Sequence, residues 1–409
     1  MVGKLWTRDF TIITLGTIIS MLGNAIAGFA LGVLILEMTN SNFAFALYLA
    51  LNSLPKLLVP VLAGTFLDRF SRVKVIYTLD MFSSVLYIVI FITLKWNVLT
   101  YPLFLVLAFM IGTVDSIYSV AYDSLYPTYI TKGNFSKAYS ISSMIYPLAA
   151  FMTPIAAFVN ETIGIEVLFV FNAAAFFIAA VFEMFLDKNE SHLKEGVKIL
   201  KFENFKEEFW SGLKFVFGDA GLRAITLYFF INSFLQGSVA QTLEMPYFKN
   251  TPHLGYTLFT YVSVANVLGR FIGGMLHYRI TLPNRYKFNI AMSVYIIICF
   301  TQGFTLYLPF PLMLVANFIT GLFAVTSFNI RISSTQSYVP NEIRGRFNGT
   351  FQMMTMSGTI LGQLIWGALG NSFDTRNLIL IGNMVTLILT YFIIFKPRNS
   401  IKRIYNQNI

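Results

Sequence analysis

Twelve long apolar stretches set the strongest constraint on how this chain can fold. A bilayer hydrocarbon core about 30 Å thick is crossed by about 20 apolar residues in an α-helix. The stretches lack the alternation of apolar and polar residues shown by membrane-barrel strands, so they predict an all-α membrane protein with twelve transmembrane helices. They are Phe10–Leu36, Phe43–Phe66, Val75–Leu94, Pro102–Tyr126, Tyr139–Val159, Val167–Leu186, Leu222–Leu243, Tyr256–His277, Phe288–Leu308, Pro311–Ser333, Arg346–Leu369 and Leu378–Phe395.

The amount of charge agrees with a lipid environment. Only 12% of the 409 residues are charged and 56% are hydrophobic, whereas soluble domains carry about 25% charged residues. The net charge of +10 comes from basic residues between the apolar stretches, so membrane topology explains it and no nucleic-acid partner is expected. Because Cys299 is the single cysteine, a disulfide within the chain is excluded.

The distribution of Lys and Arg predicts the orientation of the chain in the membrane. Of the 29 basic residues, only Lys95, Lys249 and Arg376 lie in the turns of one face, and nearly all of the others lie on the opposite face. The positive-inside rule assigns the richer face to the cytoplasm. We therefore expect a multi-pass protein of the plasma, or inner, membrane of a bacterial cell, with both termini in the cytoplasm.

A polar segment at residues 187–221 separates two halves of similar length. Its aromatic and charged residues interleave at near-helical spacing, which indicates an amphipathic helix at the cytoplasmic interface. After the fourth and the tenth stretch, Pro127–Phe135 and Pro340–Phe347 share a Pro, an Ile, a basic residue, a Gly and a Phe. The repeat predicts two pseudo-symmetric six-helix bundles. The expected parts are the bundles at 1–186 and 222–396, the linker at 187–221 and a cytoplasmic tail at 397–409.

The turn between the second and third stretches contains a recognisable motif. A glycine is followed after three residues by Asp-Arg, and after two more residues by a second Arg: Gly64, Asp68, Arg69 and Arg72. This pattern resembles the signature of the major facilitator superfamily. The segments Phe10–Pro55 and Val339–Arg346 are similar to its drug and macrolide exporter branch. The resemblance implies the major facilitator fold and export by proton antiport.

The same turn is a candidate cytoplasmic gate. Gly64 permits a tight turn, and Asp68 can face the N-terminus of a neighbouring helix, where backbone N–H groups favour an anion. The resemblance implies that this neighbour is the eleventh stretch. It also implies that Arg69 and Arg72 pair with an acid at the end of the fourth stretch, where Asp123 stands. The alternative is that the basic residues only set the topology.

Ionisable residues near the centres of their stretches are candidates for proton coupling. Lys56 in the second stretch and Asp115 in the fourth lie at similar depths, so the geometry allows an ion pair. We expect Asp115 to carry the coupling proton and Lys56 to hold it ionised until a rearrangement separates them. A permanent salt bridge is the alternative. Asp80 is a second candidate, whereas Glu183 stands at the end of a stretch, where solvation is cheap.

Two arginines lie in the inner thirds of their stretches, Arg270 in the eighth and Arg331 in the tenth. Long basic side chains there commonly extend to the membrane interface. Anion binding is the alternative, because cations inside a membrane often mark a transport pathway.

Uncharged polar residues near the stretch centres are candidates for a substrate cavity. They lie among aromatic and methionine side chains, which adapt to varied apolar ligands. Packing against lipid or other helices is the alternative reading for each one. The candidates are Asn24, Asn232, Gln236, Asn317 and Gln352.

The sequence therefore predicts a secondary transporter that exports a lipophilic small molecule by proton antiport, acting as a monomer among membrane lipids. The chain lacks a phosphate-binding loop, zinc-ligand spacing and a serine elbow, so no enzymatic activity, cofactor or metal is expected. One alternative is a lysolipid translocator of the same fold. The other is a membrane sensor or scaffold that transports nothing.

Overall fold

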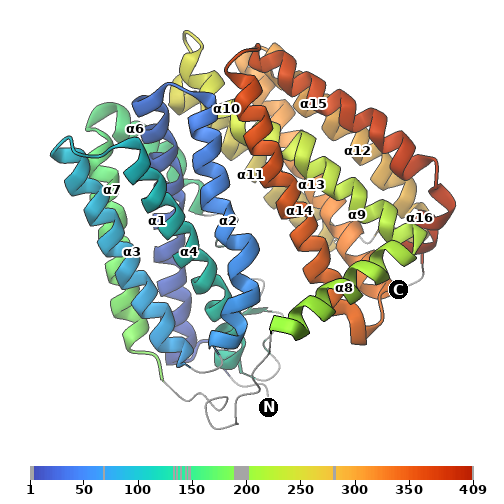
Figure 1. The fold of residues 1–409 in the computed structure, drawn as a ribbon, viewed down its shortest axis with the longest axis horizontal. Helices are drawn as coiled ribbons and strands as arrows, with labels where there is room; N and C mark the ends of the chain where they lie inside the picture. The colour runs from blue at the N-terminus through green and yellow to red at the C-terminus, as the bar shows by residue number, and fades with distance from the viewer. Residues whose placement is uncertain are drawn as a thin grey trace. The chain divides into compact units, whose positions relative to one another are not determined.

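All of the regular structure that the computed structural model describes is helical (Figure 1). It describes residues 4–67, 70–131, 134, 137–138, 141–142, 145, 149–187, 202–279 and 282–407. The α-helices are α1 (Arg8–Thr39), α2 (Asn42–Leu67), α3 (Arg72–Lys95), α4 (Tyr101–Leu125), α6 (Met152–Thr162), α7 (Ile165–Met184), α8 (Phe202–Gly218), α9 (Ala220–Asn232), α10 (Ser238–Asn250), α11 (Gly255–Arg279), α12 (Lys287–Phe304), α13 (Phe310–Tyr338), α14 (Asn341–Gly370), α15 (Thr375–Thr390) and α16 (Arg398–Tyr405). Short 3-10 turns are η1 (Tyr126–Tyr129), η4 (Asn284–Tyr286) and η5 (Thr305–Tyr307), and π turns are η3 (Ser233–Gly237) and η6 (Tyr391–Phe395).

Nine helical segments among the described residues are long and apolar enough to cross a membrane. They correspond to predicted stretches one to four, six, eight to ten and twelve. The seventh stretch forms α9, η3 and α10 without a break, and the eleventh forms α14, but neither reaches the same apolarity. The fifth stretch is described only in part, and its later residues form α6. The all-α membrane fold predicted from the apolar stretches is confirmed.

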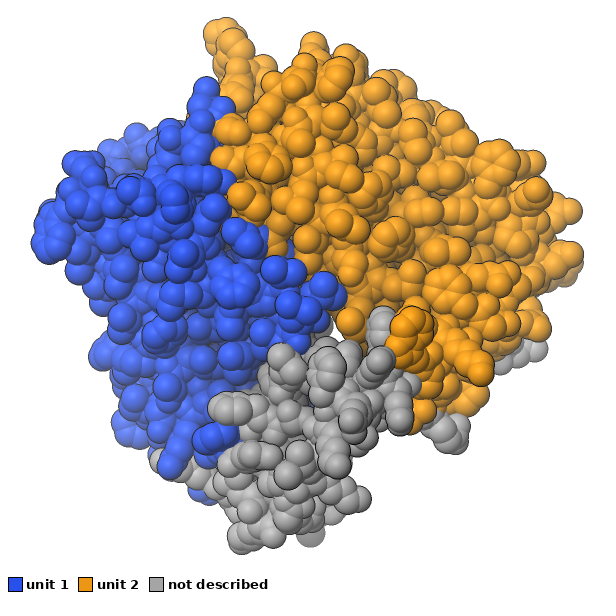
Figure 2. Space-filling model, in the orientation of Figure 1, with its two compact units in different colours: residues 1–40, 51–200 blue, residues 41–50, 201–409 orange. Residues whose placement is uncertain are grey.

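The chain forms two compact units (Figure 2). Unit 1 contains residues 1–40 and 51–200, and unit 2 contains residues 41–50 and 201–409. The first turns of α2 belong to unit 2 because Asn42 is held there: its backbone N–H donates to Asn371 Oδ1 at 2.9 Å and its side chain donates to the Gly370 carbonyl. The rest of α2 belongs to unit 1.

Helix α7 organises unit 1 by packing against α1 and α3. Gly16 and Gly23 lie two turns apart on one face of α1, and both meet side chains of α7. A Cβ at Gly23 would lie 3.3 Å from Ala175 Cβ, so the two helices approach closely at small residues. On the side toward α3, Tyr87 stacks on Phe176 with ring centroids 5.5 Å apart.

The polar segment at residues 187–221 contains α8, which belongs to unit 2. This helix packs along α14, where Gly212 lies so close that an added Cβ would be 3.0 Å from the Arg346 carbonyl oxygen. Trp210 of α8 is 59% exposed. A large exposed aromatic side chain beside charged residues is what an interfacial helix presents to lipid headgroups.

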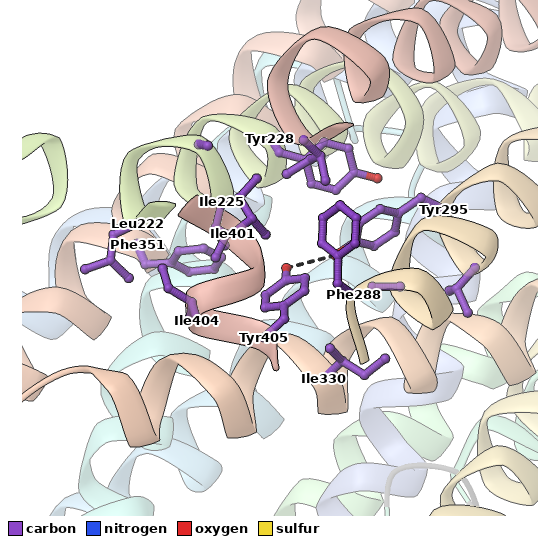
Figure 3. Close-up of a cluster of buried hydrophobic side chains, with 14 of the residues drawn as sticks. Leu222, Ile225, Tyr228, Phe288, Tyr295, Ile330, Phe351, Ile401, Ile404 and Tyr405 are labelled. Carbon is purple, nitrogen blue, oxygen red and sulfur yellow. Dashed lines mark hydrogen bonds between the residues drawn. The ribbon is translucent and has the colours of Figure 1, made fainter. Parts of the chain in front are cut away.

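The predicted C-terminal tail folds into α16, which closes one end of unit 2. Ile401, Ile404 and Tyr405 are fully buried against α9, α12 and α13. Figure 3 shows Tyr405 pointing toward Tyr295, and the two hydroxyl oxygens lie 3.0 Å apart. The tyrosine pair places a hydrogen bond inside an otherwise apolar cluster, where a buried hydroxyl needs a partner.

Asp219 ties the start of α9 to two distant parts of unit 2. Its Oδ1 accepts hydrogen bonds from Gly221 N at 2.8 Å and Leu222 N at 3.0 Å. Its Oδ2 accepts from the Tyr338 hydroxyl at 2.8 Å and pairs with Arg403 of α16 at 2.5 Å. Partial burial opposes ionisation, but these donors and the Arg403 charge outweigh it and lower the pKa of Asp219 below its usual value.

We expect Asp219→Ala to destabilise the purified protein by about 2 kcal/mol. The substitution removes the N-cap of α9 and leaves the Tyr338 hydroxyl and the Arg403 guanidinium without their acceptor. A carboxylate with a lowered pKa stabilises the folded state above its unfolded pKa of about 3.9, and this contribution is lost as the pH falls through the folded value. The difference in melting temperature between wild type and variant should therefore be full at pH 7 and shrink below about pH 4.

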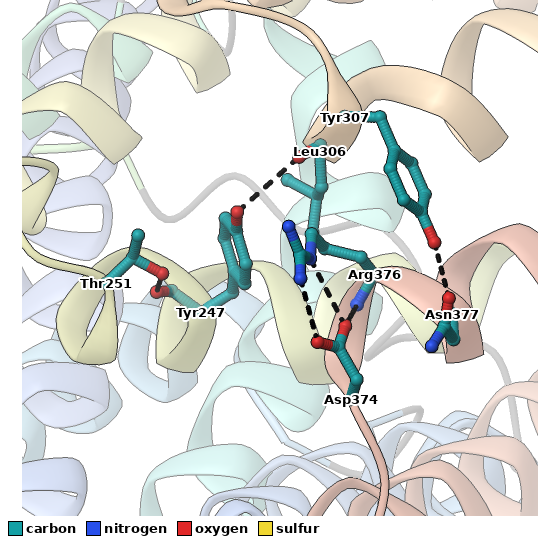
Figure 4. Close-up of polar contacts among 7 residues, drawn as sticks. All are labelled: Tyr247, Thr251, Leu306, Tyr307, Asp374, Arg376 and Asn377. Atoms are coloured by element: carbon teal, nitrogen blue, oxygen red, sulfur yellow. Dashed lines mark hydrogen bonds and ion pairs between the residues drawn. The ribbon is translucent and has the colours of Figure 1, made fainter.

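Asp374 provides the matched control for that measurement. It also caps a helix, accepting from Arg376 N at 2.8 Å and pairing with the Arg376 side chain at 3.1 Å (Figure 4). Its side chain is 43% exposed and both contacts stay within one turn. Since exposed pairs contribute about 0–1 kcal/mol, Asp374→Ala should cost less than Asp219→Ala. Equal losses would show that Asp219 acts only as a local cap.

Candidate functional site

Two acidic side chains are buried inside unit 1. Asp80 of α3 is 3% exposed and Glu183 of α7 is 0% exposed. The Ser20 hydroxyl of α1 donates to Asp80 Oδ2 at 2.8 Å, and the Tyr118 hydroxyl of α4 donates to Glu183 Oε1 at 2.8 Å. The two acids also interact electrostatically. We call Ser20, Asp80, Tyr118 and Glu183 the buried acid cluster.

Small and aromatic residues of the surrounding helices make room for this cluster. Gly16 of α1 lies against Glu183, and a Cβ at that position would be 3.4 Å from Glu183 Cγ. Tyr118 is held by a stack of rings that runs from α4 into η1. The ring centroids of Tyr118 and Tyr122 are 6.0 Å apart, and those of Tyr122 and Tyr126 are 5.3 Å apart. Four helices therefore contribute one polar side chain each to a single buried point.

Within the buried acid cluster, Glu183 Oε2 is buried and has no hydrogen-bond partner among the described residues. Elsewhere in unit 1, the side-chain oxygen of Thr14 and both side-chain polar atoms of Asn172 are buried and equally lack a described partner. An unsatisfied buried carboxylate oxygen costs the full desolvation of that atom. A proton on Glu183 would remove the charge of this carboxylate.

Asp115 and Lys56, the predicted coupling pair, interact electrostatically but form no ion pair or hydrogen bond with any described residue. Lys56 is exposed and Asp115 is partly exposed. Asp115 also acts electrostatically on Asp80. The structure thus brings Asp115 within electrostatic reach of the buried acid cluster as well as of Lys56.

The predicted gate is only partly within the described residues. Gly64 lies in the last turn of α2, whereas Asp68 and Arg69 fall outside the described residues. Arg72 begins α3, and its Nη1 donates to the Ser124 carbonyl oxygen at 3.2 Å, at the end of α4. Asp123, the residue before Ser124 in α4, is exposed.

The predicted cavity residues of unit 2 do not all lie together. Gln236 is buried in the π turn η3, where its Nε2 donates to Asn383 Oδ1 of α15 at 2.7 Å and lies 3.5 Å from Cys299 Sγ of α12. Asn232, one turn earlier, has a buried Oδ1 with no hydrogen-bond partner in the described part of the chain. π turns inside α-helices frequently mark functional sites, so this turn is the strongest cavity candidate.

The remaining cavity candidates lie elsewhere. Asn317 is buried but donates to the Met313 carbonyl of its own helix at 3.0 Å, which is a local bond. Gln352 is exposed on α14, and Asn24 is partly exposed on α1 of unit 1.

The sequence reasoning missed Glu183 and Tyr118. The expectation that Glu183 is solvated at the end of its stretch is wrong, because α1 and α4 cover it and leave it 0% exposed. Position along a helix gives depth in the membrane, but it does not tell which side faces other helices. The available signal was Gly16, a glycine that two turns of α1 separate from Gly23 on the same face.

Comparison with known proteins identifies the family. The Major Facilitator Superfamily model matches residues 13–363. A curated relative, "Uncharacterized MFS-type transporter YkuC" of Bacillus subtilis (strain 168), is 23% identical over 410 residues, which cover 96% of this chain and 93% of the relative. Within the described residues, no group of three His, Cys, Asp or Glu side chains could hold a metal ion.

Solved structures share the fold at low sequence identity. The nucleoside transporter NupG is 13% identical with a TM-score of 0.72, and the match covers 95% of this chain and 98% of that one. A peptide transporter POT bound to alafosfalin is 10% identical with a TM-score of 0.70, covering 98% and 96%. A bacterial homologue of the iron transporter ferroportin is 15% identical with a TM-score of 0.67, covering 94% and 98%. The chain belongs to the major facilitator superfamily and is a membrane transporter, not an enzyme.

Proposed function

We propose that this transporter exports a lipophilic small molecule from the cytoplasm in exchange for protons, as its resemblance to drug and macrolide exporters implies. The observation that carries the proposal is the buried acid cluster of unit 1. Ionisable groups inside a membrane protein are costly and mark proton or substrate pathways. The polar residues at the π turn of unit 2 and their aromatic neighbours support an apolar substrate with few hydrogen bonds.

Asp80 and Glu183 are the proton-carrying groups in this proposal. Two negative charges in one dry cluster repel each other, so holding one proton between them relieves the repulsion. Ser20 and Tyr118 each donate a hydrogen bond to one of the acids. A movement of α1 or α4 that breaks such a bond favours proton uptake, and its return favours release. In this proposal Asp115, which acts electrostatically on Asp80 and is itself acted on by Lys56, passes the proton between this cluster and water.

The remaining predicted features belong to the same proposal. Both termini are in the cytoplasm, because that face holds nearly all of the Lys and Arg between the helices. Asp68, Arg69, Arg72 and Asp123 form the cytoplasmic gate of unit 1. The protein works as a monomer in the plasma membrane, and it needs no cofactor.

Proton movement in proteoliposomes tests the proposed function. Vesicles loaded with the pH dye pyranine receive a panel of cationic, neutral and anionic lipophilic compounds. We expect at least one compound to change the internal pH with the purified protein, and to do so neither in empty vesicles nor with a protonophore present. A rate of substrate transport that does not depend on the proton gradient would contradict the antiport mechanism. Movement of lysolipids alone would favour the lysolipid translocator instead.

A further inference from the structure

Arg331 of α13 lies among three aromatic rings. Its Cζ is 5.2 Å from the ring centroid of Phe229, 5.2 Å from that of Phe328 and 4.5 Å from that of Phe351. The rings come from α9, α13 and α14, and the Phe229 and Phe351 centroids are 5.7 Å apart. We call these four residues the Arg331 cage.

The positive charge in this cage has no acidic partner among the described residues. The groups that act electrostatically on Arg331 are the Tyr405 and Tyr295 hydroxyls, which share a hydrogen bond with one another. No described residue accepts a hydrogen bond from its guanidinium. The guanidinium nitrogens are also not among the fully buried polar atoms that lack a partner. Two other arginines of unit 2 differ: Arg403 pairs with Asp219, and Arg270 Nε donates to Asn266 Oδ1 at 3.0 Å.

The direction of the Arg331 side chain argues against extension toward the membrane interface. Helical side chains lean toward the N-terminus of their helix and cover the preceding turn. Arg331 follows this rule, because its guanidinium lies over Phe328, three residues earlier. The nearer end of α13 is Tyr338, about two turns in the opposite direction. The guanidinium of Arg331 therefore lies farther from the Tyr338 end of α13 than the Arg331 Cα does.

A guanidinium held against ring faces keeps its edges available. Its planar fork of N–H donors matches the two oxygens of a carboxylate or a phosphate. The rings offset part of the cost of burying the cation, but they accept none of its N–H groups in the plane. Phe328 is 51% exposed, so an apolar surface continues beside the unpaired charge.

We propose that Arg331 binds the anionic group of an amphiphilic substrate, a carboxylate or a phosphate, whose apolar body lies against Phe229, Phe328 and Phe351. This inference rests on the proposed function, and it narrows the lipophilic substrate to one with a single negative charge. A second fixed negative charge would meet no further unpaired cation in the cage.

The test compares two probes that differ only in charge. The full-length protein in dodecyl maltoside is titrated with the fluorescent acid 11-(dansylamino)undecanoic acid and with its methyl ester, against empty micelles. We expect the acid to bind about tenfold more tightly or better, as for a charge-assisted bidentate contact. Arg331→Gln should reduce the acid to the affinity of the ester. Arg270→Gln, which removes another intramembrane cation, should leave the preference unchanged.

Competition then separates the two sources of the anion. Displacement of the acid probe by decanoate supports a carboxylate substrate, and displacement by lysophosphatidylglycerol supports a phosphate headgroup. Equal wild-type affinities for acid and ester would overturn the inference without any variant, so a poorly folding Arg331→Gln does not decide the result. An unchanged preference in a folded Arg331→Gln would overturn it as well.

The outcome is separable from that of the proposed function. If lipophilic compounds drive proton movement while the acid and ester bind equally, the exporter proposal stands and the anion site fails. If the acid is preferred through Arg331 but no compound moves protons, the site stands and the antiport proposal fails.

Discussion

Asp80→Asn is expected to reduce substrate-driven proton movement to background while leaving the protein folded. Asparagine has nearly the same shape, and its side-chain oxygen can still accept the hydrogen bond from Ser20, which is 2.8 Å long in the wild type. It cannot bind and release a proton. Groups that transfer protons contribute about 100-fold or more to the rates of the reactions they serve, so we expect a loss of at least about that size in the pyranine assay.

Matched acids make this prediction specific. Glu183→Gln should give the same loss, because Glu183 shares the cluster and accepts from Tyr118. Glu166→Gln should change nothing, since Glu166 lies at the exposed start of the same helix, α7. If Asp80→Asn keeps full coupling while Asp115→Asn loses it, the proton is carried at the Asp115–Lys56 pair and the buried acid cluster is structural. Substrate binding should survive Asp80→Asn, Glu183→Gln and Glu166→Gln.

The helices could be predicted from the sequence because lipid allows few alternatives for an apolar stretch. The helix ends could not, because capping sets them: α1 begins at Arg8, just after Thr7, whose side chain accepts from Phe10 N at 3.2 Å. The π turn η3 also carries no composition signal. The π turn is recognised only in the folded chain, where Gln236 donates a hydrogen bond to Asn383 of α15.

The candidate site could be predicted only where a charge stood out against its stretch. Asp80 and Asp115 were visible for that reason. Glu183 was hidden because covering helices, not its distance from the end of α7, remove it from water. Only part of the Arg331 cage could be predicted from the sequence. The arginine stands out as a charge in its stretch, but nothing distinguishes Phe229 and Phe351 among the 42 phenylalanines before three helices bring them together.

Gly321→Leu is expected to prevent unit 2 from folding correctly. Helices α11 and α13 touch backbone to backbone at reciprocal glycines. A Cβ at Gly321 would clash with the Asn266 carbonyl group, and a Cβ at Gly269 would clash with the Phe318 carbonyl and lie 2.9 Å from Leu322 N. Backbone atoms inside a helix cannot move aside as a flexible side chain can. Overpacking a well-packed core by a few carbons already costs about 1–3 kcal/mol. The free-energy cost of a leucine at this crossing should therefore exceed the free energy of unfolding of most domains.

A neighbouring glycine supplies the control for that substitution. Gly274 lies on α11 beside Gly273, yet among the described residues no atom beyond its chain neighbours and the nearby backbone of α11 lies within 4 Å of the position where its Cβ would stand. Gly274→Leu should therefore give a monodisperse peak after detergent extraction and a melting temperature close to that of wild type, whereas Gly321→Leu and Gly269→Leu should aggregate or fail to accumulate. A well-folded Gly321→Leu would mean that α11 and α13 can separate without loss of the fold, and the close crossing would then be one of several packings open to unit 2.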